Sequence, residues 1–329
     1  MRVLIHLGYP RTGTTFLQKN IFPIHKEINL LGPNNYQNAN DVKITQNDLN
    51  LLSMINNEFD LNNKIISKTD KDFIHHFDEN KINIISTEAY TMFQNVLYDF
   101  KDLRYLEILI KQKYKNVKFD FLIVLRNQYD LIKSMYHFNY HKISEILRIK
   151  DFKLIFDLLE KEIPDRYNFP LNQFLYNYDF YHLHNRLLSK FNNSKIKYLF
   201  YEDFKLNKNN FSNDLSSFLN LEEEYTKNLF NTEAVNSRKV HLNKNYYIKS
   251  KIYRFLKSKL YFYIKNLIPF KTFLKKTFLK KIFINNFIYS NIRYNTEDEE
   301  KFQKKIKNYY KNSNLKFFDQ VKINNKFDY

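Results

Sequence analysis

The sequence predicts an α/β fold in which helices cover both faces of a central parallel sheet of about five strands, giving three layers. Three features predict it: short apolar runs, helical segments between them, and a glycine-containing loop directly after the first run. The apolar runs that we expect to be strands are 3–7, 28–31, 82–85, 119–125 and 196–201. Runs that alternate with helical segments in this way are typical of parallel sheets.

The first strand, 3–7, leads into a loop that holds two of the chain's three glycines, Gly8 and Gly13. The backbone N–H groups of such a loop, together with the N-terminus of the helix that follows, can surround a phosphate. The spacing nearly matches the P-loop, Gly-x4-Gly-Lys-[Ser/Thr]. Thr14 stands where the lysine belongs, and a cation, Arg11, comes before the second glycine instead. We therefore expect a fold of the P-loop type.

The third strand, 82–85, is followed at once by Ser86, Thr87 and Glu88. A carboxylate just beyond the carboxyl end of a strand lies where open α/β sheets bind their ligands. Glu88 is therefore a candidate general base. A helix cap or a surface charge is the alternative role for this residue, and both interpretations stay open.

The fourth strand, 119–125, ends at Arg126. Asn127 and Asp130 have the spacing of an N-cap residue and its capping-box partner, so a helix is predicted to start there. Ser134 then falls on the second turn of that helix. A guanidinium fork and a hydroxyl in these positions could converge on one phosphate.

Helices are predicted over 14–21, 103–114, 215–221 and 297–310, and over 246–295 as a pair separated at Pro269. The fifth strand leads into Glu202 and Asp203, which in a nucleoside triphosphatase could be the acids that bind Mg²⁺. No histidine spacing indicates a metal site, so His75, His76, His141, His182 and His184 are expected at the surface or the edge of the core.

The net charge of +18 is concentrated late in the chain, because 234–296 contains fifteen Lys and Arg and no acidic residue. Three interpretations compete for this segment: core helices with a solvated basic face, contact with an anionic membrane surface through 246–290, or binding of an acidic polymer. Nucleic acid is not expected, since no nucleic-acid-binding motif accompanies the charge.

Composition excludes several classes of site and location. The chain has no cysteine, which excludes disulfides, thiolate metal sites and a cysteine nucleophile. A strand beginning at residue 3 leaves no room for a signal peptide, and no apolar run of about 18 residues predicts a membrane span. We therefore expect a cytoplasmic protein, at the inner face of the membrane if the basic segment docks there.

The stretch Gly-Tyr-Pro-Arg-Thr-Gly-Thr-Thr-Phe-Leu-Gln, 8–18, resembles the 5′-phosphosulfate loop of sulfotransferases that use 3′-phosphoadenosine 5′-phosphosulfate (PAPS). The stretch from Arg126 to Tyr136 resembles the 3′-phosphate motif of the same family. Gln128 replaces the proline that is usual there, which should loosen the turn slightly without removing a ligand. The resemblance to this family covers most of the chain. The sequence match is close at the two motifs and weak elsewhere.

This resemblance implies a set of site residues. The implied cofactor-binding residues are Pro10, Arg11, Thr12, Gly13, Thr14, Thr15, Arg126, Ser134 and Arg238. Arg11 would also be catalytic, by neutralising charge that develops on the leaving phosphate, and Glu88 would take the proton of the acceptor. PAPS would be the donor and 3′-phosphoadenosine 5′-phosphate (PAP) the product. No metal is implied, because Arg11 would supply the charge that Mg²⁺ supplies in kinases.

The implied acceptor is a hydroxyl or amine of a bacterial surface glycan or glycolipid, bound by 34–80 and 139–195. We expect one domain over 1–329, with a nucleotide-binding core in 1–235, the basic helical segment in 236–295 and terminal helices in 296–329. Two other functions stay open: a P-loop kinase or nucleoside triphosphatase acting on a small molecule, and a non-catalytic protein that binds a membrane surface or a polyanion.

Overall fold

The structure, a computed structural model, describes residues 1–32, 74–88, 91, 100–138, 155, 174–231, 246–249, 289–292, 296–325, 327 and 329. The chain divides into two compact units. The first comprises Met1–Leu131, Gln173–Ser237 and Tyr310–Tyr329, and the second comprises Ile132–Asn172 and Arg238–Tyr309. The expectation of one domain with three successive parts stays a prediction.

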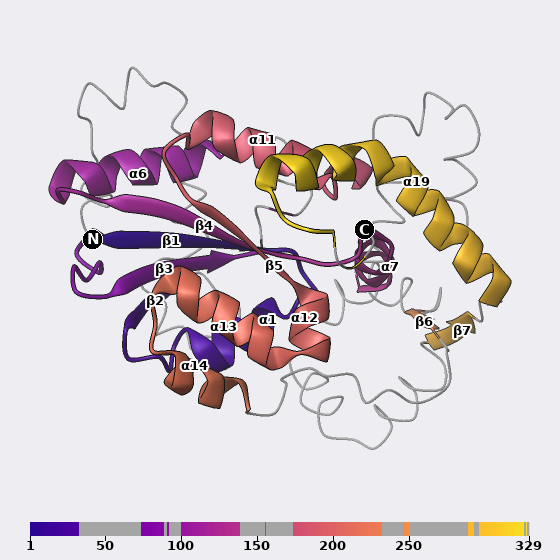
Figure 1. The fold of residues 1–329 in the computed structure, drawn as a ribbon, viewed down its shortest axis with the longest axis horizontal. Coiled ribbons are helices and arrows are strands. Elements are labelled where there is room, and N and C mark those ends of the chain that lie inside the picture. The colour runs from indigo at the N-terminus through magenta and orange to yellow at the C-terminus, as the bar shows by residue number, and fades with distance from the viewer. Residues whose placement is uncertain are drawn as a thin grey trace, which may run out of the picture. The chain divides into compact units, whose positions relative to one another are not determined.

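The predicted sheet is confirmed. Its five strands are β1 (Arg2–Gly8), β2 (Ile28–Gly32), β3 (Ile82–Thr87), β4 (Lys118–Leu125) and β5 (Ile196–Phe200). They lie in the order β2-β3-β1-β4-β5, and every pairing is parallel (Figure 1). Apolar side chains fill both faces of the central strands, which is why these strands appear in the sequence as continuous apolar runs.

The carboxyl ends of three neighbouring strands meet at β1. Leu7 is paired with Thr87 of β3, and Gly8 is paired with Val124 of β4. The chain passes from β3 to β4 across β1, so β1 lies where the strand order reverses, the position at which open α/β sheets bind ligands. The residues that follow these strands, including Glu88 and Arg126, are thereby brought to the same edge of the sheet.

Helices cover both faces of the sheet, with α1, α13 and α14 on one face and α6 and α11 on the other (Figure 1). The helices are α1 (Thr14–Phe16), the π-helical η1 (Leu17–Ile21), α6 (Lys101–Lys113), α7 (Gln128–Phe138), α11 (Phe180–Lys190), α12 (Tyr201–Leu206), α13 (Lys208–Leu219), α14 (Glu223–Phe230) and α19 (Thr296–Val321). On the first face, Leu4 and Leu122 pack with Phe16, Phe204 and Phe211 in one buried cluster. This packing fixes the helix that follows the glycine loop against the sheet.

The helical prediction for 246–295 is wrong at both ends of that segment. Strand β6 (Tyr246–Lys249) pairs antiparallel with β7 (Tyr289–Ile292). Aromatic and β-branched residues favour strands, and short apolar runs do not distinguish the two kinds of element by their period alone. Residues 250–288, with Pro269, lie outside the described part of the chain. The last predicted helix is longer than expected, since α19 continues to Val321.

Candidate active site

The loop between β1 and α1 contains two residues with left-handed backbone conformations. Gly13 has φ of 83°, and Arg11 has φ of 74°, which is uncommon for a residue with a side chain. Thr12 lies buried between them, and its Oγ1 donates a hydrogen bond to the Tyr9 carbonyl at 2.6 Å. Left-handed residues in such a turn are typical of loops whose successive N–H groups form a concave anion site.

Gly8 is required by its contact with the first turn of α1. A Cβ at this position would lie 1.8 Å from Cγ2 of Thr14. Two non-bonded carbons have their optimal separation at about 3.5–4.0 Å, so no side chain fits there without displacing Thr14. This contact explains why a chain with only three glycines has one of them at position 8.

Glu88 lies against this loop. The Thr14 hydroxyl donates a hydrogen bond to Glu88 Oε1. Burial raises the pKa of the Glu88 carboxyl above its ordinary value, while the Thr14 hydrogen bond and the Arg11 charge lower it. The structure thus brings Glu88, predicted from its place after the third strand, together with Arg11 and Thr14, which were predicted from the glycine loop. A carboxyl group whose pKa is raised is suited to general base catalysis closer to neutral pH.

Thr91 joins the ends of β1 and β3. Its hydroxyl donates to the Gly8 carbonyl at 2.9 Å and to the Glu88 carbonyl at 3.2 Å. This contact fixes the position of the glutamate relative to the glycine loop. Thr91 was not predicted from the sequence, because no local motif distinguishes it from other threonines.

Arg126 connects the two predicted phosphate motifs. Its Nη1 donates to the Arg11 carbonyl at 2.9 Å, and its guanidinium lies 4.8 Å from the centre of the Tyr201 ring. The Arg126 Nε is buried and has no hydrogen-bond partner among the described residues. A buried guanidinium N–H without a partner is costly, and an anion bound there would satisfy it.

The turn after Arg126 has the predicted cap. Asn127 Oδ1 accepts from the N–H groups of Tyr129 at 3.1 Å and Asp130 at 3.4 Å, as an N-cap residue does. Gln128 was expected only to loosen this turn slightly. Its buried side-chain amide instead donates a hydrogen bond to the Tyr178 carbonyl at 2.9 Å. Pairing of this amide strengthens the turn that the loss of proline was expected to loosen.

The remaining predicted residues divide into three groups. Pro10 and Thr15 lie in the glycine loop and at the start of α1. Ser134 lies in α7 beyond Leu131, within the second compact unit. Arg238 lies outside the described residues, as do most of 34–80 and 139–195, where the acceptor was expected to bind.

A buried polar cluster that the sequence analysis missed links β1, β3 and η1. His6 Nδ1 lies 2.7 Å from Ser86 Oγ, and Gln18 Nε2 donates to the same oxygen at 2.9 Å. Burial lowers the pKa of His6 to about 3, so the imidazole is neutral at physiological pH. The only signal in the sequence is the polar residue inside the first apolar run.

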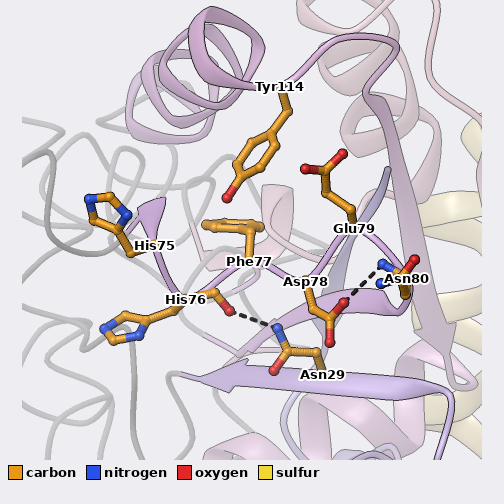
Figure 2. A pocket seen from close by; sticks show the side chains of 8 residues that line it. All are labelled: Asn29, His75, His76, Phe77, Asp78, Glu79, Asn80 and Tyr114. Carbon is orange, nitrogen blue, oxygen red and sulfur yellow. Dashed lines mark hydrogen bonds between the residues drawn. The ribbon is translucent and has the colours of Figure 1, made fainter.

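A pocket of about 510 Å³ lies at the opposite edge of the sheet, where β2 and β3 begin (Figure 2). Its lining residues are Asn29, His75, His76, Phe77, Asp78, Glu79, Asn80 and Tyr114. Asn29 Nδ2 donates to the His76 carbonyl at 2.8 Å, and the Tyr114 hydroxyl donates to the Ile74 carbonyl at 3.1 Å. These bonds hold the chain as it enters β3. None of the predicted catalytic or cofactor-binding residues lines this pocket, but six of its residues, 75–80, belong to 34–80, where the acceptor was expected to bind.

In the described part of the chain, no group of three or more His, Cys, Asp or Glu residues could hold a metal ion. Among the helices of that part of the chain, none is both long enough and apolar enough to cross a membrane.

Comparison with known proteins gives a family match. A family model described as "Sulfotransferase domain" matches residues 2–266. A solved structure, the crystal structure of a sulfotransferase from Alicyclobacillus acidocaldarius, is similar over 98% of this chain and 96% of that chain, with 12% sequence identity and a TM-score of 0.46. No curated protein matches the chain.

Replacing Gly8 by Ala should displace Thr14 and lower the free energy of unfolding by about 1–3 kcal/mol, the usual cost of overpacking. Urea denaturation measures this change. The double variant Gly8→Ala/Thr14→Ser removes the colliding Cγ2 methyl and keeps the hydroxyl, so it should regain part of the lost stability. A Gly8→Ala protein as stable as the wild type would contradict the steric argument.

An NMR titration of the Glu88 carboxyl should give a pKa above 4.5, since burial is the largest influence on it. The folded state then binds this proton more tightly than the unfolded state does. The contribution of Glu88 to stability is therefore full below pH 4.5 and is lost as the pH rises through the folded pKa. Thr14→Val removes a hydrogen bond that lowers the pKa, so it should raise the value further. An unchanged or lower pKa in that variant would show that the contact is unimportant.

Proposed function

The chain belongs to the sulfotransferase domain family, and we propose that it moves the sulfuryl group of PAPS to a hydroxyl or amine of a bacterial surface glycan or glycolipid. One contact carries the proposal for the donor: the hydrogen bond of 2.9 Å from Arg126 to the carbonyl of Arg11. It joins a loop suited to a 5′-phosphate with an arginine suited to a 3′-phosphate. The acceptor class is inferred from the sequence resemblance.

The proposed donor site follows from the chemistry of these groups. The N–H groups of Thr12 to Thr15 would bind the 5′-phosphate, since loops with left-handed residues favour anions. Arg126 would bind the 3′-phosphate. The proposed roles of Ser134 and Arg238 in binding PAPS rest on the sequence resemblance alone. The buried Arg126 Nε supports this role, because a phosphate oxygen would satisfy a donor that is unpaired among the described residues.

Two residues would act on the transfer itself. The sulfuryl group moves to the acceptor oxygen while its bond to the 5′-phosphate breaks, and the electron pair of that bond stays on the phosphate. Arg11 would stabilise this developing charge, and Glu88 would accept the proton of the acceptor. Arg11 lies close enough to Glu88 for its charge to lower the pKa of that carboxyl, which supports a shared site.

The kinase alternative requires acids after β5 that are able to bind Mg²⁺, and Glu202 is poorly placed for this role. Glu202 Oε1 accepts from the Asn127 N–H at 2.9 Å, and Glu202 Oε2 accepts from the Tyr329 hydroxyl at 2.5 Å. A carboxylate engaged on both oxygens is a poor candidate for binding Mg²⁺. Contact with an anionic membrane surface through 246–290 stays part of the proposal, on the basis of the charge of that segment. A cytoplasmic location also stays part of the proposal, as the sequence analysis expected.

PAP should stabilise the protein without Mg²⁺, and should do so more than ATP with Mg²⁺ at the same concentration. At about 100 times its dissociation constant, one bound ligand adds about 2.7 kcal/mol, which a thermal-shift assay detects. Arg126→Lys keeps the charge but loses the planar fork, so the PAP shift should shrink. Arg2→Lys is the matched control, since Arg2 lies at the opposite end of β1 and pairs with Asp120 at 2.9 Å. Stabilisation by ATP with Mg²⁺ and none by PAP would support a kinase instead.

Replacing Glu88 by Gln should lower the rate of PAP formation from PAPS by about 10²–10⁴-fold, as expected for loss of a general base. The binding of PAP, measured by calorimetry, should stay within a few-fold of the wild-type value. Water can serve as the acceptor in this assay, so the natural acceptor need not be known. Normal turnover by Glu88→Gln would exclude this residue as the base and leave the family assignment standing.

A further inference from the structure

The turn that follows Arg126 is bonded to a segment near the end of the chain, Tyr310–Tyr329. Gln128 and Asn314 exchange amide hydrogen bonds: Gln128 Nε2 donates to Asn314 Oδ1 at 3.1 Å, and Asn314 Nδ2 donates to Gln128 Oε1 at 2.7 Å. Both side chains are buried, with exposed fractions of 3% and 1%. A proline at position 128 could not make this pair.

The same segment contacts the turn a second time, through Glu202. This carboxylate accepts the backbone N–H of Asn127 on one oxygen and the hydroxyl of Tyr329 on the other. The Tyr329 ring packs against Phe180, Phe200 and Phe318, with ring centres 5.6–6.0 Å apart. Burial and the Glu202 charge raise the pKa of Tyr329, so its hydroxyl stays protonated and donates.

The segment is also held independently of the turn. The Tyr310 hydroxyl donates to the Leu175 carbonyl at 2.6 Å, and the Ser313 hydroxyl donates to Asp179. Asp179 in turn accepts from the His182 N–H and so caps α11. The segment therefore gives the turn a fixed support rather than moving with it.

We propose that Tyr310–Tyr329 positions the Arg126 guanidinium, through Asn314 on Gln128 and through Tyr329 and Glu202 on Asn127. The proposal rests on the proposed function, in which Arg126 binds the 3′-phosphate. The two contacts reach the two residues directly after Arg126, and Tyr201, whose ring lies beneath the guanidinium, is the neighbour of Glu202. Asn314 and Tyr329 are positioning residues on this account, and they set the preference for a nucleotide that carries a 3′-phosphate.

The physical reason is the geometry of charged hydrogen bonds. A guanidinium that binds a phosphate with two N–H groups must be held in one orientation, and small displacements remove much of the gain. The 5′-phosphate site depends on the backbone of a different loop, which neither Asn314 nor Tyr329 contacts in any described hydrogen bond. Loss of either support should therefore weaken recognition of the 3′-phosphate alone.

The test compares binding of PAP with binding of AMP, which has the same 5′-phosphate and lacks the 3′-phosphate. Calorimetry on the full chain gives both dissociation constants for the wild type, Tyr329→Phe and Asn314→Ala. Each variant should bind PAP about three- to tenfold more weakly, the fold-change of one hydrogen bond, and should bind AMP as the wild type does. Asn314→Asp serves in place of Asn314→Ala if the latter does not fold.

Tyr310→Phe is the matched control, because it removes a buried tyrosine hydroxyl from the same segment without touching the turn. Its ratio of AMP to PAP dissociation constants should equal that of the wild type. A Tyr329→Phe change made in a Glu202→Gln background should have a smaller effect on the ratio than in the wild type, since Tyr329 acts through that carboxylate.

The outcomes separate this inference from the proposed function. A wild type that prefers PAP, with unchanged ratios in Tyr329→Phe and in the Asn314 variant, would overturn the positioning role and leave the proposed function intact. A wild type that binds PAP no more tightly than AMP would overturn the 3′-phosphate site, and the positioning role with it. Equal loss of PAP and AMP binding in the variants would show a general structural effect and would also overturn the inference.

Discussion

The hydrogen bond from the Arg126 guanidinium to the Arg11 carbonyl is the contact on which this account depends. The two residues are 115 positions apart in sequence, and the parallel pairing of β1 with β4 brings the ends of their strands together. Because the bond uses a backbone carbonyl, it sets the position of the guanidinium relative to the glycine loop. The loop, the base and the arginine become one site through it.

The loop is stabilised by contacts that are individually small. Gly8 leaves the space that the Thr14 methyl occupies, and the Thr14 hydroxyl then reaches Glu88. Beneath the loop, the neutral His6 and the Ser86 hydroxyl join β1 to β3. Burial of the Glu88 carboxyl raises its pKa, and burial of the His6 imidazole lowers the pKa of that ring.

The strands and the two motifs could be predicted because they depend on local sequence: a run such as 119–125 is apolar on both faces, and the glycine spacing is contiguous. The contacts of Gln128 could not, since its amide partner Asn314 lies 186 residues away. Tyr329 and Thr91 gave no signal for the same reason. The helical prediction for 246–295 failed at β6 and β7, because a short apolar run with aromatic residues suits either type of element.

A crystal structure of the complex with PAP would show whether one nucleotide occupies both phosphate sites. We expect one nucleotide, with its 5′-phosphate bonded to backbone N–H groups of the loop from Thr12 to Thr15 and its 3′-phosphate bonded to the Arg126 guanidinium. A 3′-phosphate bound away from Arg126, or a nucleotide bound in the pocket beside Asn29 and His76, would contradict this expectation.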